Sequence, residues 1–440
     1  MTFREALLNG LAPDGGLYMP LSIPAADADE IEAFRHMKYH EVAYGILRHW
    51  IVNEIEEQSL RKICKEAYDF EVPVEESGSK CHILRLDRGP TASFKDFAAR
   101  MMGRIMQYFL ADEKRNITIL TATSGDTGSA VANAFHGLNN IDTVILFPSE
   151  EVTALQRKQM TTLAGNVRVI AINGKFDDCQ KLVKKAFRDP RLAQIPLSSA
   201  NSINIGRLLP QAVYYFYAWS RISSKSGESA IFSVPSGNFG NLMGGLIARE
   251  MGLPVKKFII STNSNNEVPV YLKTGIYQKI SPSLNCISSA MNVGHPGNLP
   301  RIIALYRGVM DHEGKIIREP DLVRMRKDFY PVSITDEETR ETIRKSYLES
   351  GVILEPHGAV AWAGMQRYLS NCLPEELANK IFIVLETAHP AKFSEEIGKL
   401  LSVEPSVPSQ LESILKKREE YIMLENNYDI FRDFILKNYN

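Results

Sequence analysis

The chain has 440 residues, of which 44% are hydrophobic and 23% are charged, and its formal net charge is -1. A chain of this length exceeds a single hydrophobic core, so we expect two domains. The near-zero charge gives no electrostatic reason to expect nucleic acid or an anionic membrane as a partner. No apolar run approaches membrane-spanning length, and the opening MTFREALLNGLAPDGG lacks the apolar centre of a signal peptide.

The five cysteines are scattered, with no C-x-x-C pair: Cys64, Cys81, Cys179, Cys286 and Cys372. This pattern is typical of reduced thiols in a cytosol rather than of a disulfide framework or a zinc site. We therefore expect a cytoplasmic protein without a metal centre, acting as a monomer or a homodimer on a small molecule.

In chain order, residues 1–75 are expected to be mostly helical around a Gly- and Pro-rich turn, LAPDGGLYMP. Short apolar runs rich in β-branched residues then predict strands at 116–120, 143–147, 167–172, 230–234, 257–261 and 381–385. Longer helical segments separate these runs, which predicts an α/β fold of two doubly wound domains with mostly parallel sheets. We expect a helical segment at 1–75, a smaller α/β domain at 76–210 and a larger one at 211–440, whose final helices are structural.

A helix is predicted to begin at Lys95, in the stretch PTASFKDFAAR. Its apolar residues form two adjacent ribs at i, i+4 spacing: Phe97, Met101, Ile105 and Phe109, then Ala98, Met102, Met106 and Leu110. Lys95 stands between Phe94 and Phe97, where desolvation and the positive helix end both lower the pKa of an amine. A neutral amine is what a Schiff base to an aldehyde cofactor requires. The alternative is a lysine that snorkels to solvent beside Asp96.

A first loop, Ser124-Gly125-Asp126-Thr127-Gly128, follows the strand predicted at 116–120 and leads into an apolar helix. Free backbone N–H groups and the positive helix end make such a turn an anion site, to which hydroxyls add donors. The alternative is a tight turn in which Asp126 caps the helix.

A second loop, SGNFGN, follows the strand predicted at 230–234. Gly237 and Gly240 let the backbone approach a ligand closely, and the loop amides can encircle a phosphate. The loop is neither a P-loop nor G-x-G-x-x-G, and a Gly-x-x-Gly turn alone is also found in ordinary loops.

A third loop, ETAHPAKF, follows the strand predicted at 381–385. Ligands of open α/β sheets bind at the carboxyl ends of strands, so Thr387 is placed to present its hydroxyl to a cleft. The alternative is a Pro-assisted turn with His389 hydrogen-bonded locally. The sequence contains no H-E-x-x-H, no G-x-S-x-G and no kinase motifs.

Lys95, the second loop and the third loop together match the needs of pyridoxal phosphate. Its aldehyde requires a lysine, its phosphate requires an anion-binding loop, and its ring nitrogen requires a polar partner. Lys95, the run 237–241 and Thr387 offer one of each.

Six motifs carry a joint resemblance to a known family: RGPTASFKDFAAR, TSGDTGSAVA, SANSINIGRLLPQ, PSGNFGN, EPHGAVA and TAHPAKF. In this order the chain resembles the threonine synthases, pyridoxal-phosphate enzymes of the tryptophan-synthase-β fold type (fold type II). The opening FREALLNGLAPDGGLYMP resembles microbial members, so the likeness spans nearly the whole chain. Two positions depart from the usual motif, with Arg88 where a histidine is common and Ala92 where a leucine is common.

The resemblance implies a role for each motif. Lys95 would hold the cofactor aldehyde and then act as the base that shuttles protons. The cofactor phosphate would be bound by Gly237, Asn238, Phe239, Gly240 and Asn241, and Thr387 would meet the ring nitrogen. Asp126 occupies the place near the cofactor's phenolic oxygen where many relatives carry an asparagine.

The family reaction converts O-phosphohomoserine and water to L-threonine and phosphate, which implies two further anion sites. We expect the turn of Ser124, Gly125 and Thr127 to bind the substrate carboxylate. For the substrate phosphate we expect Asn201 and Arg207, with Ser93, Lys158 or Arg157 as further candidates. Arg207 suits bidentate phosphate binding, although an arginine in an ordinary surface ion pair is the alternative.

Three competing functions remain open from the sequence. A phospholyase of the same fold would release 2-oxobutyrate from O-phosphohomoserine instead of hydrating the β-carbon. A serine/threonine dehydratase would have no need of Arg207 and a second phosphate pocket. A non-catalytic protein that binds a phosphorylated metabolite would not need a reactive amine.

Overall fold

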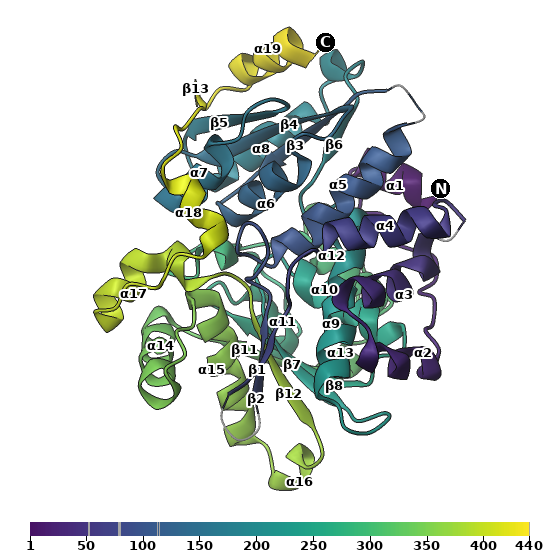
Figure 1. Ribbon diagram of the computed structural model, residues 1–440, viewed down its shortest axis with the longest axis vertical. Helices are drawn as coiled ribbons and strands as arrows, with labels where there is room; N and C mark the ends of the chain where they lie inside the picture. Colours follow the sequence, from purple (N-terminus) through teal and green to yellow (C-terminus); the bar gives the residue numbers. More distant parts are fainter. Residues whose placement is uncertain (52, 78–80, 112, 114, 440) are drawn as a thin grey trace.

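The computed structural model describes residues 1–51, 53–77, 81–111, 113 and 115–439. Two sheets of mostly parallel strands, each covered by helices, make up the molecule (Figure 1). In the view of Figure 1 the five-stranded sheet lies above the six-stranded sheet, and helices α1–α4 of the amino-terminal segment lie at the right. The expected α/β class with mostly parallel sheets is confirmed.

The larger sheet has the strand order β1-β2-β12-β7-β8-β11, with every neighbouring pair parallel except β1 and β2. Its strands are β1 (Val74–Ser77), β2 (Cys81–Arg85), β7 (Ala230–Pro235), β8 (Val255–Thr262), β11 (Phe329–Ser333) and β12 (Ile381–Glu386). Every residue of β7 and β12 is buried, because helices cover both faces of a parallel sheet.

The smaller sheet has the order β13-β5-β4-β3-β6 and is parallel throughout. Its strands are β3 (Ile117–Ala122), β4 (Ile141–Pro148), β5 (Val167–Asn173), β6 (Leu197–Ser199) and β13 (Ile422–Glu425). A two-stranded ribbon joins β9 (Val309–Met310) to β10 (Ile316–Arg318). All six strands predicted from apolar runs are present.

The strand pairing differs from the expected domain boundaries at two points. Strand β2, expected in the smaller domain, pairs with β12 of the larger sheet, and β13, expected in the larger domain, pairs with β5 of the smaller sheet. Both strands are short, and β13 is largely exposed, so neither carries the long apolar run that marks a buried strand.

Helices surround both sheets. Those of the amino-terminal segment are α1 (Phe3–Asn9), α2 (Ala28–Ala33), α3 (Tyr39–Ile51) and α4 (Glu57–Ala67). The next are α5 (Lys95–Ala111), α6 (Asp126–Phe135), α7 (Ala154–Thr161), α8 (Phe176–Ala186), α9 (Leu209–Ile222), α10 (Gly240–Glu250), α11 (Glu267–Thr274) and α12 (Leu299–Leu305). The last are α13 (Leu322–Asp328), α14 (Asp336–Ser350), α15 (Pro356–Asn371), α16 (Pro374–Leu377), α17 (Ser394–Leu401), α18 (Ser409–Leu415) and α19 (Tyr428–Tyr439).

Helix α5 begins at Lys95, as predicted, and its two apolar ribs are buried. It packs against α6, α4 and α9. The ring of Phe97, in its first turn, lies edge-on to the rings of Tyr39 and Tyr214. The hydroxyl of Tyr68, which follows α4, donates to the backbone oxygen of Phe97 at 2.8 Å. These contacts fix the start of α5, and with it Lys95, between the two sheets.

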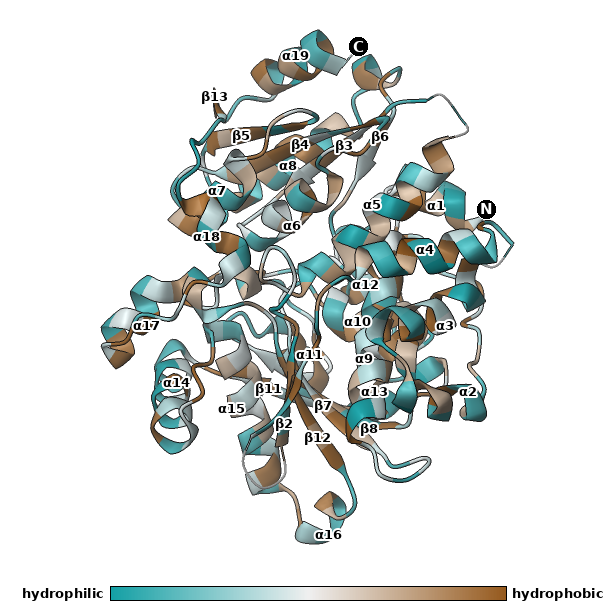
Figure 2. Cartoon of the chain, viewed as in Figure 1, coloured by the Kyte–Doolittle hydropathy of each residue, from teal (hydrophilic) through white to brown (hydrophobic). Residues whose placement is uncertain are grey.

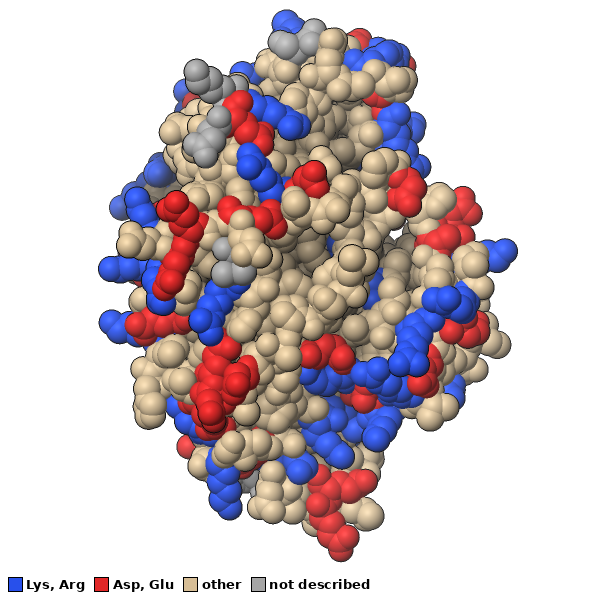
Figure 3. Space-filling view, turned by 90° about the vertical axis from the view of Figure 1, so that its right-hand side faces the viewer, with Lys and Arg blue, Asp and Glu red and all other residues tan. Residues whose placement is uncertain are grey.

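The outer surface is mixed in charge. Figure 2 shows hydrophobic strands inside and hydrophilic residues on outer helices such as α14, and in Figure 3 cationic and anionic side chains are interspersed. None of the helices in the described part of the chain is long and apolar enough to cross a membrane.

Candidate active site

A cavity of about 1110 Å³ is lined by residues from loops of both sheets. Twelve of the residues predicted for the site line it: Lys95, Ser124, Asp126, Thr127, Asn201, Arg207, Gly237, Asn238, Phe239, Gly240, Asn241 and Thr387. Gly125 and Ser93 do not line the cavity, and both are buried. The loops after β3, β7 and β12 therefore meet, because the carboxyl ends of these strands face one cleft.

Backbone hydrogen bonds hold Lys95 beside the third loop. The N–H of Phe94 donates to the oxygen of Thr387 at 2.8 Å, and the N–H of His389 donates to the oxygen of Ala92 at 3.0 Å. Ser93 lies between these two bonds, paired with Ala388, and its buried Oγ has no hydrogen-bond partner among the described residues.

The Lys95 side chain is only 13% exposed, so it does not snorkel to solvent. Its Nζ lies 3.6 Å from Oδ2 of Asp126 and 4.8 Å from the centre of the Phe94 ring. Burial lowers the pKa of Lys95; Asp126 opposes this shift, and the cations of Lys392 and Arg207 add to it. The predicted perturbed amine is present.

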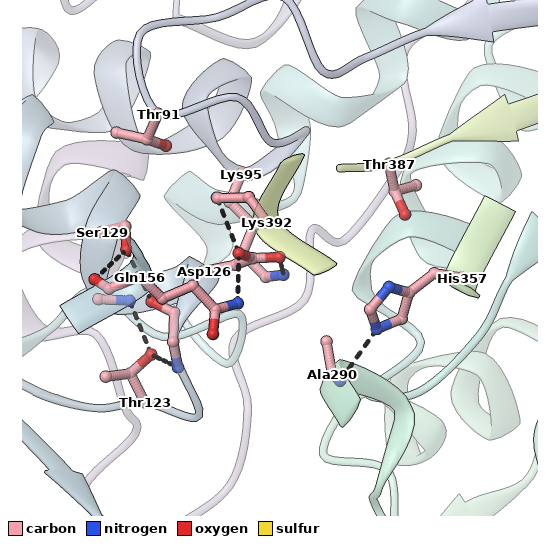
Figure 4. Close-up of polar contacts among 12 residues, drawn as sticks. Thr91, Lys95, Thr123, Asp126, Ser129, Gln156, Ala290, His357, Thr387 and Lys392 are labelled. Atoms are coloured by element: carbon pink, nitrogen blue, oxygen red, sulfur yellow. Dashed lines mark hydrogen bonds and ion pairs between the residues drawn. The ribbon is translucent and has the colours of Figure 1, made fainter. Parts of the chain in front are cut away.

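Asp126 does not cap α6, because Gly125 is the capping residue and Oγ1 of Thr123 accepts the N–H groups of Gly125 and Gly128 at 2.9 and 2.8 Å. Instead Oδ1 of Asp126 accepts from Nζ of Lys392 at 2.8 Å and from Nε2 of Gln156 at 2.9 Å (Figure 4). Burial alone would raise the pKa of Asp126, but the two lysines outweigh it and hold the pKa below its usual value. Asp126 is therefore a buried carboxylate between two amines.

The second loop turns into α10 through Phe239, whose φ of 60° is left-handed. A Cβ at Gly237 would lie 2.8 Å from the backbone oxygen of Ala290, so only glycine fits there without movement. The hydroxyls of Tyr214 and Tyr215 both donate to Oδ1 of Asn241, at 2.6 and 2.7 Å.

Two features make this loop a suitable phosphate site. Nδ2 of Asn241 is buried and has no hydrogen-bond partner among the described residues. The first N–H groups of α10 open toward the cavity at the positive end of the helix. Together they form a cradle of donors for an anion.

Thr387 contacts a buried carboxylate, Glu355, that was not predicted from the sequence. The Thr387 hydroxyl donates to Oε1 of Glu355 at 3.2 Å, and Oε2 of Glu355 lies 2.5 Å from Nδ1 of His357. Nε2 of His357 accepts from the N–H of Ala290 at 3.0 Å, so Nδ1 carries the proton and donates to Glu355. In Figure 4, Thr387 and His357 lie together, apart from Lys95 and Asp126.

Glu386, next to Thr387, is a second buried carboxyl group. It accepts the N–H of Glu355 at 2.8 Å, and burial, followed by the nearby Glu355, raises the pKa of Glu386 well above its usual value. The motif EPHGAVA supplies Glu355, which caps α15, and His357 in its first turn, and this position at a helix start was the available signal for them.

Among the candidates for the substrate phosphate, Arg207 is fully buried and lines the cavity. It forms no ion pair with any described residue; its Nη1 donates to the oxygen of Ala200, and its Nε has no partner. Burial lowers the pKa of Arg207 to about 10. Asn201 donates to the oxygen of Ala122 at 2.9 Å and also lines the cavity. Arg207 is therefore not an ordinary surface ion pair.

Arg157 and Lys158 lie outside the cavity. Arg157 pairs with Glu419 at 2.8 Å, and Nζ of Lys158 donates to the backbone oxygen of Leu415. Both cations are thus used to hold the carboxyl-terminal segment, and neither is available to a ligand in the cavity.

The residues present fit pyridoxal phosphate. Lys95 offers a partly desolvated amine, the start of α10 offers unpaired donors around Gly237 and Asn241, and Thr387 offers a hydroxyl. No group of three or more His, Cys, Asp or Glu side chains in the described ranges is placed to hold a metal.

Comparison with known proteins agrees with this geometry. A family model described as pyridoxal-phosphate dependent enzyme matches residues 70–386, and models described as threonine synthase N terminus and threonine synthase, C-terminal match residues 1–68 and 359–435. Fold and site thus define a pyridoxal-phosphate-dependent enzyme.

The relatives narrow this class. A curated threonine synthase from Haemophilus influenzae is 40% identical over 438 residues, 99% of this chain and 97% of the relative. The structure of a pyridoxal-phosphate-bound threonine synthase from Brucella melitensis matches with a TM-score of 0.91 and 34% identity, over 100% of this chain and 97% of that one. The Escherichia coli threonine synthase structure matches with a TM-score of 0.88 and 36% identity, over 99% and 97%. The chain belongs to the threonine synthase family.

Proposed function

We propose that the chain converts O-phospho-L-homoserine and water to L-threonine and phosphate. One observation carries the proposal: the desolvated amine of Lys95 and the buried guanidinium of Arg207, which forms no ion pair with any described residue, line the same cavity. A buried cation without an anionic partner is costly, and a dianionic phosphate is the ligand that best satisfies it.

The substrate offers three groups for which the cavity has places. Its phosphate would be bound by Arg207 and Asn201. Its carboxylate would be bound by the turn at the start of α6, where the hydroxyls of Ser124 and Thr127 line the cavity and make no hydrogen bond with other described residues. Its carbon chain would then extend past Lys95.

When bound, pyridoxal phosphate supplies an electron sink for the charge left by removal of a proton next to the amino group. The run 237–241 would hold its phosphate and Thr387 its ring nitrogen. The reaction removes protons from two substrate carbons, releases phosphate and adds water. Lys95 would accept and return these protons at Nζ, which requires an amine whose pKa lies closer to neutrality than that of a free lysine.

Product analysis tests the proposal. The purified protein is supplied with pyridoxal phosphate and O-phosphohomoserine, and threonine, 2-oxobutyrate and phosphate are measured beside a Lys95→Ala variant. Threonine from the parent and none from the variant supports the proposal. Release of 2-oxobutyrate alone would instead identify a phospholyase. A parent protein that develops no visible absorbance with the cofactor would identify a non-catalytic protein.

The remaining expectations are also proposals. We propose a cytoplasmic monomer or homodimer of fold type II that binds no nucleic acid and no membrane. All five cysteines are free thiols, which supports a reducing compartment. Light scattering of the purified protein would give its oligomeric state.

A further inference from the structure

A second buried lysine lies beside Lys95, and the roles described above leave it without a task. Lys392 belongs to the short 3-10 helix Pro390–Phe393 after β12, and its side chain is completely buried. Among the described residues it forms one ion pair, in which Nζ donates to Oδ1 of Asp126 at 2.8 Å (Figure 4). Lysine is rarely buried so fully unless it has a defined partner.

Asp126 lies between the two lysines but does not bind them equally. The 2.8 Å distance to Lys392 is that of a charge-assisted hydrogen bond, whereas the 3.6 Å between Oδ2 and Nζ of Lys95 is too long for one. Gln156 fills a further position on Oδ1 with a neutral amide at 2.9 Å. One carboxylate cannot neutralise two buried ammonium groups, so the lysine with the longer contact gives up its proton more easily.

The other charges around Lys95 do not reverse this order. The groups that face it from the surrounding elements are Asp126 of α6, Lys392, Arg207 at the end of the 3-10 helix Ile205–Arg207, and Glu355 before α15. Arg207 adds a second positive charge. Glu355 is engaged by Thr387 and His357, and Asp96, in the first turn of α5, is held by Thr91 at 2.6 Å.

We propose that Lys392 is a positioning residue that occupies Asp126 as an ammonium and thereby leaves Lys95 as the neutral amine of the site. The inference deepens the proposed function and rests on it for the use of that amine. A neutral Lys95 can attack an aldehyde carbon or take up a proton from a substrate carbon, whereas an ammonium can do neither. The charge arrangement itself is a property of the chain without cofactor or substrate.

The test measures the titration of Lys95 in the cofactor-free protein. Competitive acetylation with acetic anhydride is carried out across a pH series, and the modified fraction at Lys95 is quantified by mass spectrometry. In Lys392→Met, Asp126 loses its closer partner and becomes the counter-ion of Lys95. The apparent pKa of Lys95 is then expected to rise by about one pH unit or more. Lys392→Gln, which keeps a neutral donor to Asp126, is expected to show the same direction.

A double variant separates charge from packing. Asp126→Asn combined with Lys392→Met removes both charges, so the pKa of Lys95 should fall back to the parent value or below it. Lys399→Met, at an exposed lysine paired with Glu395 on α17, is the matched control and should leave Lys95 unchanged. Far-ultraviolet circular dichroism confirms that each variant is folded. Should Lys392→Met fail to fold, Lys392→Gln and the double variant give the same comparison.

The proposal is overturned if Lys95 titrates alike in the parent and in the folded Lys392 variants, or if the double variant keeps the raised value. This outcome is independent of the proposed reaction, which is judged by the products of the parent enzyme. A parent that releases 2-oxobutyrate would refute the reaction and leave the Lys392 result intact.

Discussion

The hydroxyl of Thr387, a residue that lines the cavity, donates its proton to Oε1 of Glu355, 3.2 Å away. The same carboxylate accepts from the N–H groups of His357 and Gly358 at 2.8 and 3.0 Å, which fixes its position. Since its proton is committed to Glu355, the Thr387 oxygen presents lone pairs to the cavity. Thr387 therefore acts toward a ligand mainly as an acceptor.

This relationship predicts the effect of removing the hydroxyl. Thr387→Val keeps the shape of the side chain but leaves Glu355 without one of its donors, and turnover is expected to fall by roughly 10- to 100-fold, the worth of a buried charge-assisted hydrogen bond. Thr387→Ser keeps the hydroxyl and should retain most of the activity. Steady-state kinetics and cofactor titration by absorbance measure both effects. Equal losses in the two variants would show that the methyl group, not the hydroxyl, matters.

The unpaired guanidinium of Arg207 predicts that its removal impairs substrate binding but not cofactor binding. In Arg207→Met the KM for O-phosphohomoserine should rise by roughly 10- to 100-fold, because a charge-assisted contact to phosphate is lost, while the affinity for the cofactor stays near that of the parent. Arg157→Met is the matched control, since Arg157 is paired with Glu419 outside the cavity. An unchanged KM in Arg207→Met would place the substrate phosphate elsewhere.

The crowding at Gly237 predicts that a larger residue there impairs cofactor binding specifically. A methyl group there would lie 2.8 Å from both the Ala290 oxygen and the Met291 Cα, so the loop must move. Gly237→Ala should weaken pyridoxal phosphate binding by about tenfold or more, measured by equilibrium titration, since displaced amides lose their aim at the phosphate. Gly227→Ala, at a left-handed glycine with open space around it, should lower the melting temperature slightly and leave cofactor affinity unchanged.

The buried carboxyl group of Glu267, at the start of α11, should make the stability of the fold depend on pH. Burial raises its pKa from 4.5 to about 7, and its Oε2 has no hydrogen-bond partner among the described residues. Because the folded-state pKa is the higher one, the stabilising effect of the protonated form is full below about pH 4.5 and is lost as the pH rises through 7. Glu267→Gln should therefore raise the free energy of unfolding at pH 8, by at most about 3 kcal/mol, and change it little at pH 4.5.

Urea unfolding of parent and variant at both pH values checks this prediction. Glu341→Gln, at an exposed position on α14, serves as the control and should show no such difference between the two pH values. A gain that is equal at pH 4.5 and pH 8 would indicate that the amide improves packing and that titration is not the cause.

The sequence sufficed for the buried strands and for the start of α5 at Lys95, because both follow from local patterns. An apolar run such as 381–385 must be buried, and the rib of α5 fixes where that helix begins. The pairing of β2 with β12 was not predictable in this way, since it depends on contacts between segments about 300 residues apart. The partners of Asp126 and Thr387 were missed for the same reason, as Lys392 and Glu355 meet them only in the folded chain.

The position of strand β13 late in the chain affects how the smaller sheet forms during synthesis. Strand β13 pairs with β5, whose sequence leaves the ribosome long before residues 422–425 do. In the same way, Arg157 of α7 is synthesised long before Glu419, its ion-pair partner. During synthesis the smaller sheet thus carries an open edge at β5, a surface on which other nascent chains can pair. That edge can close only after residues 422–425 have been synthesised and have paired with β5, so β13 protects the smaller sheet from pairing with other chains.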